Sequence, residues 1–126
     1  MNGGIDMQPA LTEAVYYILL SLLQPMHGYG IMQNTEALSE GRVRLAAGTL
    51  YGALNTLLEK GWIAALPETG DSRGRKEYVI TDAGRAALHA EIERLSALAA
   101  IGRRLTEQTE GYQETHNQKM VLGMGI

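Results

Sequence analysis

Apolar residues recur at helical spacing in four segments of this 126-residue chain. The pattern predicts helices over residues 11–23, 28–39, 47–60 and 82–108. The first helix should end before Pro25, because proline disfavours helical geometry in the residue before it, and the third should end at Gly61. Thr81 and Asp82 favour the start of the fourth helix, because a hydroxyl caps the first turn and an acid stabilises the positive end of the helix dipole.

Two strand-like segments, residues 62–67 and 76–80, lie between the third and fourth helices. The residues between them, 68–75, are rich in turn formers, so the two segments are expected to form a β-hairpin. The final residues, 110–126, show no sustained apolar period and contain three glycines, which predicts a loose tail. The chain is therefore expected to be mainly helical, with one small β-hairpin.

The predicted third helix has an outer face with almost no charge. Leu50, Leu54 and Leu57 recur on one side of it and would pack into a core. The other side carries small or polar residues, namely Thr49, Gly52, Ala53, Asn55, Thr56 and Lys60. A helix face in contact with solvent usually carries more charge than this.

The order of helix, helix, helix, hairpin and helix is that of a winged helix-turn-helix domain. In such domains the third helix enters the major groove of DNA, which is about 12 Å wide. Bulky or acidic side chains on the outer face of that helix would obstruct its entry. The bare face therefore predicts a DNA-binding domain over residues 11–81, preceded by an extension over residues 1–10.

The composition is that of an ordinary soluble protein, with 45% hydrophobic and 20% charged residues, and the length fits a single core. The chain has no cysteine, which excludes disulfides and thiolate metal sites and fits a reducing cytoplasm. Its longest apolar segment, residues 14–23, is far shorter than the roughly 20 residues of a membrane span, and its N-terminus lacks the features of a signal peptide. We therefore expect a cytoplasmic protein with no membrane segment.

The net charge of −3 opposes binding to a polyanion, but the charges are unevenly distributed. Acidic residues gather in the last third of the chain, at Glu91, Glu93, Glu107, Glu110 and Glu114. Arg73, Arg75 and Lys76 lie at the hairpin tip. Arg42 and Arg44 lie just before the third helix. Flexible cations at these places can neutralise phosphates, although a hairpin tip that is merely solvated fits the same residues.

Five sequence blocks follow one another along the chain: MHGYGI at 26–31, GTLYGAL at 48–54, LLEKGWI at 57–63, RGRKEY at 73–78 and ITDAGR at 80–85. Together they resemble the PadR-like transcriptional regulators, over roughly residues 11–105. The short C-terminus resembles the smaller subgroup of that family, whose members lack a separate C-terminal domain. The resemblance implies a dimeric winged-helix repressor whose fourth helix crosses to the partner subunit.

The chain departs from the family's usual pattern at two places in the third helix. Gly52 stands where the family usually has proline, and a glycine there would let the backbone approach a duplex more closely. The family tends to place Arg or Lys around Asn55 and Thr56, and this chain has neither there. More of the phosphate contact is therefore expected from the hairpin.

Three side chains of the third helix each allow more than one interpretation. Tyr51 is either a partly buried core residue or, as the resemblance implies, a hydroxyl that contacts a phosphate. Thr49 is a capping residue, a phosphate ligand, or both. Asn55 is either inert or reads a base, because its amide can bond an adenine edge in both directions. The predicted DNA-contacting residues are Arg42, Arg44, Thr49, Tyr51, Gly52, Asn55, Thr56, Lys60, Arg73, Arg75 and Lys76.

No arrangement of residues indicates an enzyme. His27, His89 and His116 lie far apart and have no carboxylate at metal-ligand spacing, so we expect no metal site and no catalytic histidine arrangement. The GYG sequence at residues 28–30 lacks the further glycine and the preceding strand of a phosphate loop, and no cofactor is predicted. One alternative to DNA binding stays open, namely a winged-helix module that binds another protein.

The predicted fourth helix carries an apolar stripe over about five turns, which is longer than a domain of this size needs to cover one side. The stripe consists of Leu88, Ile92, Leu95, Leu98, Ile101 and Leu105. Because the preceding elements are expected to close a core without it, the stripe predicts a homodimer formed through residues 82–109. A two-fold dimer predicts a palindromic operator with half-sites about 34–36 Å apart for each helical turn, and an effector that shifts this separation would release the DNA.

Overall fold

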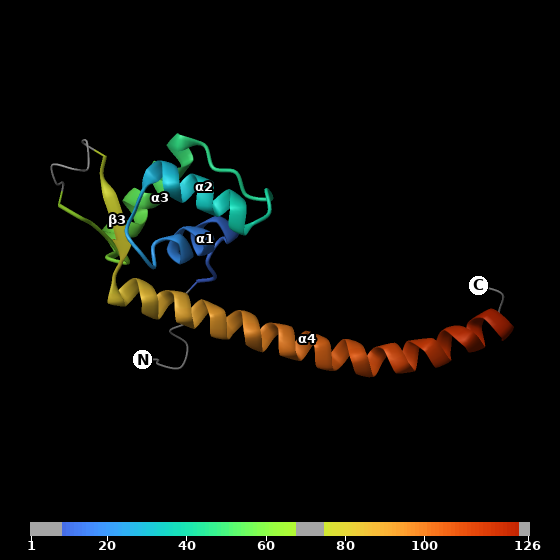
Figure 1. Cartoon of the computed structure of the whole chain (residues 1–126). Coiled ribbons are helices and arrows are strands. Elements are labelled where there is room, and N and C mark those ends of the chain that lie inside the picture. The colour runs from blue at the N-terminus through green and yellow to red at the C-terminus, as the bar shows by residue number, and fades with distance from the viewer. Residues whose placement is uncertain (1–8, 68–74, 124–126) are drawn as a thin grey trace. The chain divides into compact units, whose positions relative to one another are not determined.

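The computed structural model describes residues 9–67 and 75–123, with the side chains of the second range as far as Thr109. The elements are α1 (Glu13–Ser21), β1 (Met26–His27), α2 (Gly28–Leu38), α3 (Ala47–Lys60), β2 (Ile63–Ala65), β3 (Glu77–Ile80) and α4 (Asp82–Gly123). Figure 1 labels the four helices and β3. The four helices and the two hairpin strands predicted from the sequence are all present. The prediction of a mainly helical fold with a small antiparallel sheet is confirmed.

The sheet has three strands rather than the two of the predicted hairpin. Its order is β1-β3-β2, and both pairings are antiparallel. β1 pairs Met26 with Tyr78, and β2 pairs Ile63 with Ile80. The sequence did not reveal β1, because a strand of two residues is too short to show an alternating pattern.

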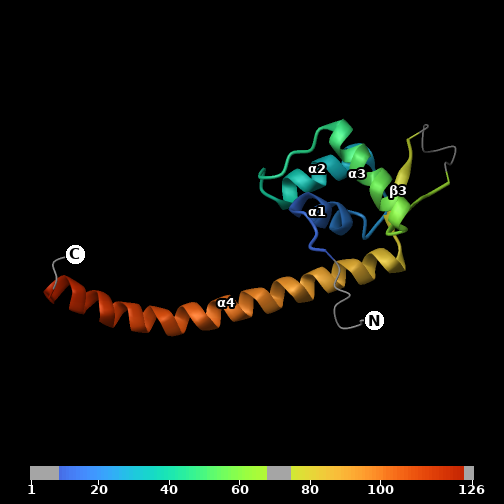
Figure 2. The ribbon, with the colours of Figure 1, turned by 180° about the vertical axis from the view of Figure 1, so that it is seen from behind.

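The core lies between the first three helices and the inner side of the sheet. Both views of the ribbon show α1, α2 and α3 packed together with β3 beside them (Figures 1 and 2). The predicted leucines of α3 are buried, and the neighbouring elements also contribute fully buried residues. These residues are Ile18, Leu19 and Leu22 from α1 and its end, and Ile31 from α2.

α3 ends at Gly61, as predicted. Gly61 has a φ of 76°, its N–H donates to the Leu58 carbonyl over 3.0 Å, and the Trp62 N–H donates to the Leu57 carbonyl over 3.0 Å. This pair of bonds is the Schellman ending of a helix, in which glycine adopts a left-handed conformation without steric cost. At the other end the N-cap is Ala46, which offers no side-chain bond, so Thr49 is not the capping residue.

Thr81 caps the start of α4, which confirms the predicted N-terminal signal. Its Oγ1 accepts the Gly84 N–H over 3.1 Å and donates to the Gly61 carbonyl over 2.6 Å, while its N–H donates to the Trp62 carbonyl over 2.9 Å. Gly84 leaves no room for a side chain, because a Cβ there would overlap the Trp62 carbonyl oxygen. The first turn of α4 is therefore held against the end of α3 by both hydrogen bonds and close packing.

Two expectations for α4 were wrong. The helix does not give way to a loose tail after residue 109 but continues to Gly123. No proline follows Pro67, and an established helix adds residues such as Gln, Glu and Lys without a new nucleation cost, even where no apolar period is present. Among the described residues, no helix combines the length and the apolar composition needed to cross a membrane.

The second error concerns Leu88, which was assigned to the dimer stripe. Leu88 is 4% exposed and its neighbours Ala87 and Glu91 are also buried, so the first turns of α4 complete the core of the compact unit that extends to Glu91. The preceding elements do not close that core alone. Ile92 is partly exposed, and the stripe that remains open in the chain consists of Leu95, Leu98, Ile101 and Leu105.

Candidate nucleic-acid interface

The outer face of α3 is exposed and uncharged over its first turns. Thr49, Gly52 and Asn55 all lie on this face. A Cβ at Gly52 would meet no atom within 4 Å, so nothing within the described chain covers this part of the helix. The last turns of the same helix carry Glu59 and Lys60, both exposed. The bare surface that a DNA groove requires therefore extends along α3 as far as Thr56 and ends before Glu59.

A groove of about 560 Å³ runs between α3, the start of α2 and β3. Four of the predicted DNA-contacting residues line it, namely Tyr51, Asn55, Arg75 and Lys76. The structure thus brings two polar side chains of the third helix together with two cations of the hairpin. A surface that combines hydrogen-bonding groups of a helix with flexible cations suits a duplex, because the first can reach base edges and the second can pair with phosphates.

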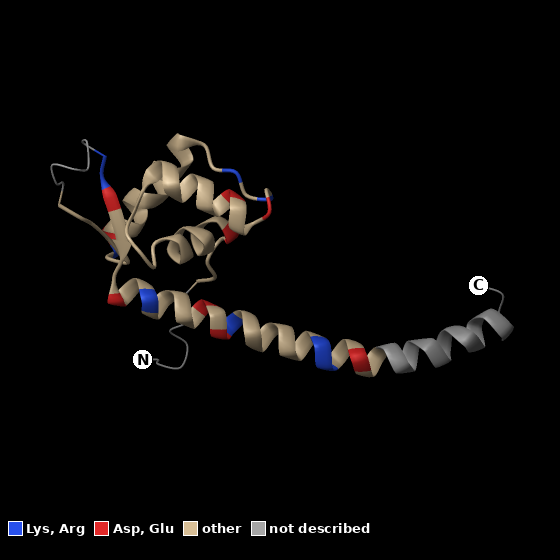
Figure 3. Cartoon of the chain, in the orientation of Figure 1, with Lys and Arg blue, Asp and Glu red and all other residues tan. Residues whose placement is uncertain are grey.

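Arg75 and Lys76 are both exposed and form no ion pair with any described residue. Figure 3 shows the cationic positions at the outer end of β3 and a second group in the connection between α2 and α3. Arg73, the third predicted cation of the hairpin, lies outside the described residues. The positive charge of the groove in the described chain therefore rests on Arg75 and Lys76.

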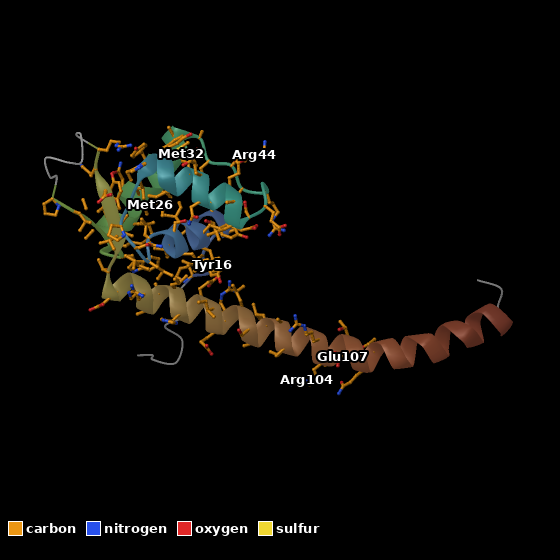
Figure 4. The ribbon with its side chains drawn as sticks, in the orientation of Figure 1. Tyr16, Met26, Met32, Arg44, Arg104 and Glu107 are labelled. Atoms are coloured by element: carbon orange, nitrogen blue, oxygen red, sulfur yellow. The ribbon has the colours of Figure 1, made fainter. Side chains whose placement is uncertain are left out.

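Arg42 and Arg44 do not join this groove. Arg42 Nη2 lies 2.6 Å from Glu13 Oε2, and its Nε donates to the same oxygen over 2.9 Å. This hydrogen bond to Glu13 raises the pKa of Arg42. Arg44 Nε lies 3.7 Å from Glu36 Oε2, and Figure 4 places Arg44 on the side of the domain away from β3. Both cations already have a carboxylate partner, which weakens the case for them as phosphate contacts.

Lys60 and Thr56 lie on the flank of α3 rather than in the groove. The Lys60 ammonium stands 4.7 Å from the centre of the Trp62 ring, a cation–π contact. The Thr56 hydroxyl donates to the Gly52 carbonyl of its own helix over 3.2 Å. Both side chains line a smaller, mostly apolar pocket together with the start of α1.

Four further residues of the groove were not predicted from the sequence, namely His27, Gly28, Tyr29 and Tyr78. Tyr29 is 64% exposed in the first turn of α2, and His27 caps that helix by accepting the Gly30 N–H at Nδ1 over 3.3 Å. Tyr78 is buried, and burial, followed by the proximity of Tyr51, raises its pKa. The aromatic residues of the MHGYGI and RGRKEY blocks were the signal that could have indicated them.

Among the described residues, no three His, Asp or Glu side chains gather closely enough to hold a metal ion.

Comparison with known families gives one match over more than half of the chain. The model of the Transcriptional regulator PadR-like family matches residues 18–90, which include α2, α3 and the hairpin strands. A solved PadR family transcriptional regulator from Eggerthella lenta is similar in structure, with a TM-score of 0.60 and 28% identity over 74% of this chain and 80% of that one.

Two curated proteins are similar in sequence. Transcriptional regulator Rv3488 of Mycobacterium tuberculosis is 38% identical over 65 residues, and an uncharacterized 37.1 kDa protein in transposon TN4556 of Streptomyces fradiae is 37% identical over 88 residues. The matches cover 52% and 69% of this chain respectively. The chain spans 61% of the length of the first relative and 24% of the second.

Proposed function

Because this chain belongs to the PadR-like family of transcriptional regulators, we propose that it binds double-stranded DNA through α3 and the β2–β3 hairpin. The family consists of regulators rather than enzymes. The observation that carries the proposal is the groove in which Tyr51 and Asn55 lie together with Arg75 and Lys76, two cations that form no ion pair with any described residue. In the proposed complex the first turns of α3 enter the major groove, and Arg75 and Lys76 lie along the adjacent phosphates.

The finer proposal is a cytoplasmic homodimeric repressor that a small-molecule effector releases from a palindromic operator. The exposed apolar residues of α4 support self-association, because such a series is rarely left uncovered on a monomer. A two-fold dimer presents α3 twice, which requires two half-sites of the same sequence. An effector bound near the dimer contact would alter the separation of the two α3 helices.

The test is the salt dependence of duplex binding. Fluorescence anisotropy should measure the affinity for duplexes from the region upstream of the protein's own gene and for a random duplex of equal length, at several salt concentrations. A DNA-binding regulator loses affinity steeply as salt rises, because binding releases counterions from the phosphates. A winged-helix module that binds another protein would show no such affinity for either duplex.

Replacing Arg75 and Lys76 with glutamine should weaken binding to specific and random duplexes alike. Each lost phosphate contact flattens the plot of log affinity against log salt by roughly one unit, so the slope should change by up to about two. The matched control is Arg103→Gln with Arg104→Gln, which removes the same charge from exposed positions of α4. If both double variants have the same effect, the hairpin has no specific role in phosphate binding.

Asn55→Ala should change which sequences are bound more than how tightly random DNA is bound. A good amide pair with an adenine edge discriminates by about 1–3 kcal/mol, whereas an alanine cannot make it. Binding to the operator and to operators with single base changes is the measurement. Gln33→Ala, which removes an amide from the exposed surface of α2 outside the groove, is the control. Equal losses on operator and random DNA would exclude Asn55 from base reading.

A further inference from the structure

Tyr51 of α3 lies directly against Gly28, the first residue of α2. A side chain at position 28 would overlap the Tyr51 hydroxyl and would come within 2.9 Å of the ring carbon Cζ. Gly28 is buried, whereas Tyr51 remains 46% exposed. The absence of a side chain at position 28 is therefore what allows the end of the ring to reach the start of α2.

The backbone at position 28 does not itself require glycine. Among the described residues, the glycines with a positive φ are Gly41 and Gly61, so Gly28 adopts a conformation open to any residue. Its strand neighbour His27 and its helix neighbour Tyr29 have side chains that line the same groove. The steric contact with Tyr51 is the reason that remains for a glycine at this position.

The Tyr51 hydroxyl lies in the protein groove that is proposed to bind DNA. Gly28 and Tyr51 line it together with Arg75 and Lys76, and the buried Tyr78 lies close to Tyr51. A phenol hydroxyl donates one hydrogen bond, and the phosphate oxygens of a duplex are acceptors. A hydroxyl that lines the same groove as two cations can donate to the phosphates with which those cations would pair.

We infer that Gly28 is a positioning residue for DNA binding, because its missing side chain places the Tyr51 hydroxyl where it donates a hydrogen bond to a backbone phosphate. The inference rests on the proposed function and assigns a role to the first residue of α2, outside the recognition helix. Since a phosphate contact carries no sequence information, its loss should affect all duplexes equally.

The test is a double-mutant cycle on the full chain, with a random-sequence duplex and an operator duplex as probes. Tyr51→Phe removes only the hydroxyl and should weaken binding to both by about tenfold, with an unchanged salt slope because no charge is lost. Gly28→Ala should cost a similar factor, because the added methyl displaces the half-exposed ring. In a Tyr51→Ala background, where nothing is left to displace, Gly28→Ala should cost less than about twofold.

Thermal unfolding of the wild type, Gly28→Ala, Tyr51→Ala and the combination of these two substitutions separates positioning from folding. If Gly28→Ala lowers the unfolding temperature, Tyr51→Ala should restore it, because the overlap is with that ring alone. An equal cost of Gly28→Ala in both backgrounds, or wild-type affinity in Tyr51→Phe, would overturn the inference and leave the proposed function intact. A wild-type chain that binds neither duplex would overturn both.

Discussion

The double variant Leu95→Asp, Leu98→Asp should sediment as a monomer and lose operator binding at the same time. Leu95 is 41% and Leu98 is 53% exposed in the single chain. Both lie on the same side of α4 as Ile101 and Leu105, which are also exposed. Two carboxylates placed in an apolar contact between copies would cost several kcal/mol each in lost hydration. Because a dimer holds its two α3 helices on one operator, its loss should weaken binding by roughly 10²–10⁴-fold.

The matched control places the same two charges on the other side of the helix. Ser96 and Ala100 are exposed, and the helical rotation of about 100° per residue turns them away from the apolar side. Ser96→Asp with Ala100→Asp should leave both the sedimentation coefficient and the operator affinity near those of the wild type. A Leu95, Leu98 variant that is monomeric yet binds the operator as tightly as before would exclude dimerisation from the mechanism.

Gly84→Ala should destabilise the DNA-binding domain more than an ordinary methyl insertion. The added Cβ would overlap the Trp62 carbonyl oxygen and lie 2.7 Å from Ile80 Cγ1, and that carbonyl also accepts the Thr81 N–H. Backbone cannot move aside as a side chain can, so the free energy of unfolding should fall by about 3 kcal/mol, at the upper end of overpacking effects. For a domain of this size, that corresponds to a fall of roughly 12–24 °C in the unfolding temperature.

Thermal unfolding followed by circular dichroism, at a fixed protein concentration, measures this effect. Gly48→Ala in the first turn of α3 is the matched control, because a Cβ there would meet nothing within 4 Å. Alanine favours a helix over glycine by about 1 kcal/mol, so this control should be neutral or slightly stabilising. Equal unfolding temperatures for the two variants would show that the contact at Gly84 is not tight in solution.

The parts of the fold that depend on nearby residues could be predicted from the sequence. The spacing of Leu50, Leu54 and Leu57 predicts the buried side of α3, and Gly61 and Thr81 mark helix ends through bonds to residues a few positions away. β1 could not be predicted, because its pairing partner lies far along the chain and its two residues carry no pattern of their own. Helix ends and buried helix faces can thus be predicted from residues close in the sequence, whereas the pairing of β1 with β3 cannot.

The same distinction applies to the candidate site. The position of Asn55 on the outer side of α3 follows from helical spacing, whereas the sequence allowed Tyr51 to be either a core residue or an exposed one. The structure brings both beside Arg75 and Lys76. The carboxylate that pairs with Arg42 comes from Glu13, in the first turn of α1, and no local pattern indicates that pair.

Leu88 was misassigned for a related reason. Helical spacing in the sequence places it in line with Leu95 and Leu98. Spacing does not reveal where along a helix the chain's own core ends. In the structure the core reaches Glu91, and Leu88 falls within it.

The central position of β3 determines the order in which the domain can be completed. Within the part of the chain that the structure describes, β1 and β2 do not pair with each other, and β3 is the strand partner of both. β1 ends about fifty residues before β3 begins, and bringing the two strands together closes a loop of that length at an entropic cost. Helix formation has no such cost, because its hydrogen bonds join residues that are close in the sequence. A nascent chain leaves the ribosome with its N-terminus first. Helices α1, α2 and α3 therefore emerge before the sheet can form and before Leu88 and Glu91 can complete the core. We therefore expect closure of the sheet by residues 77–80, rather than helix formation, to set how fast this domain becomes native.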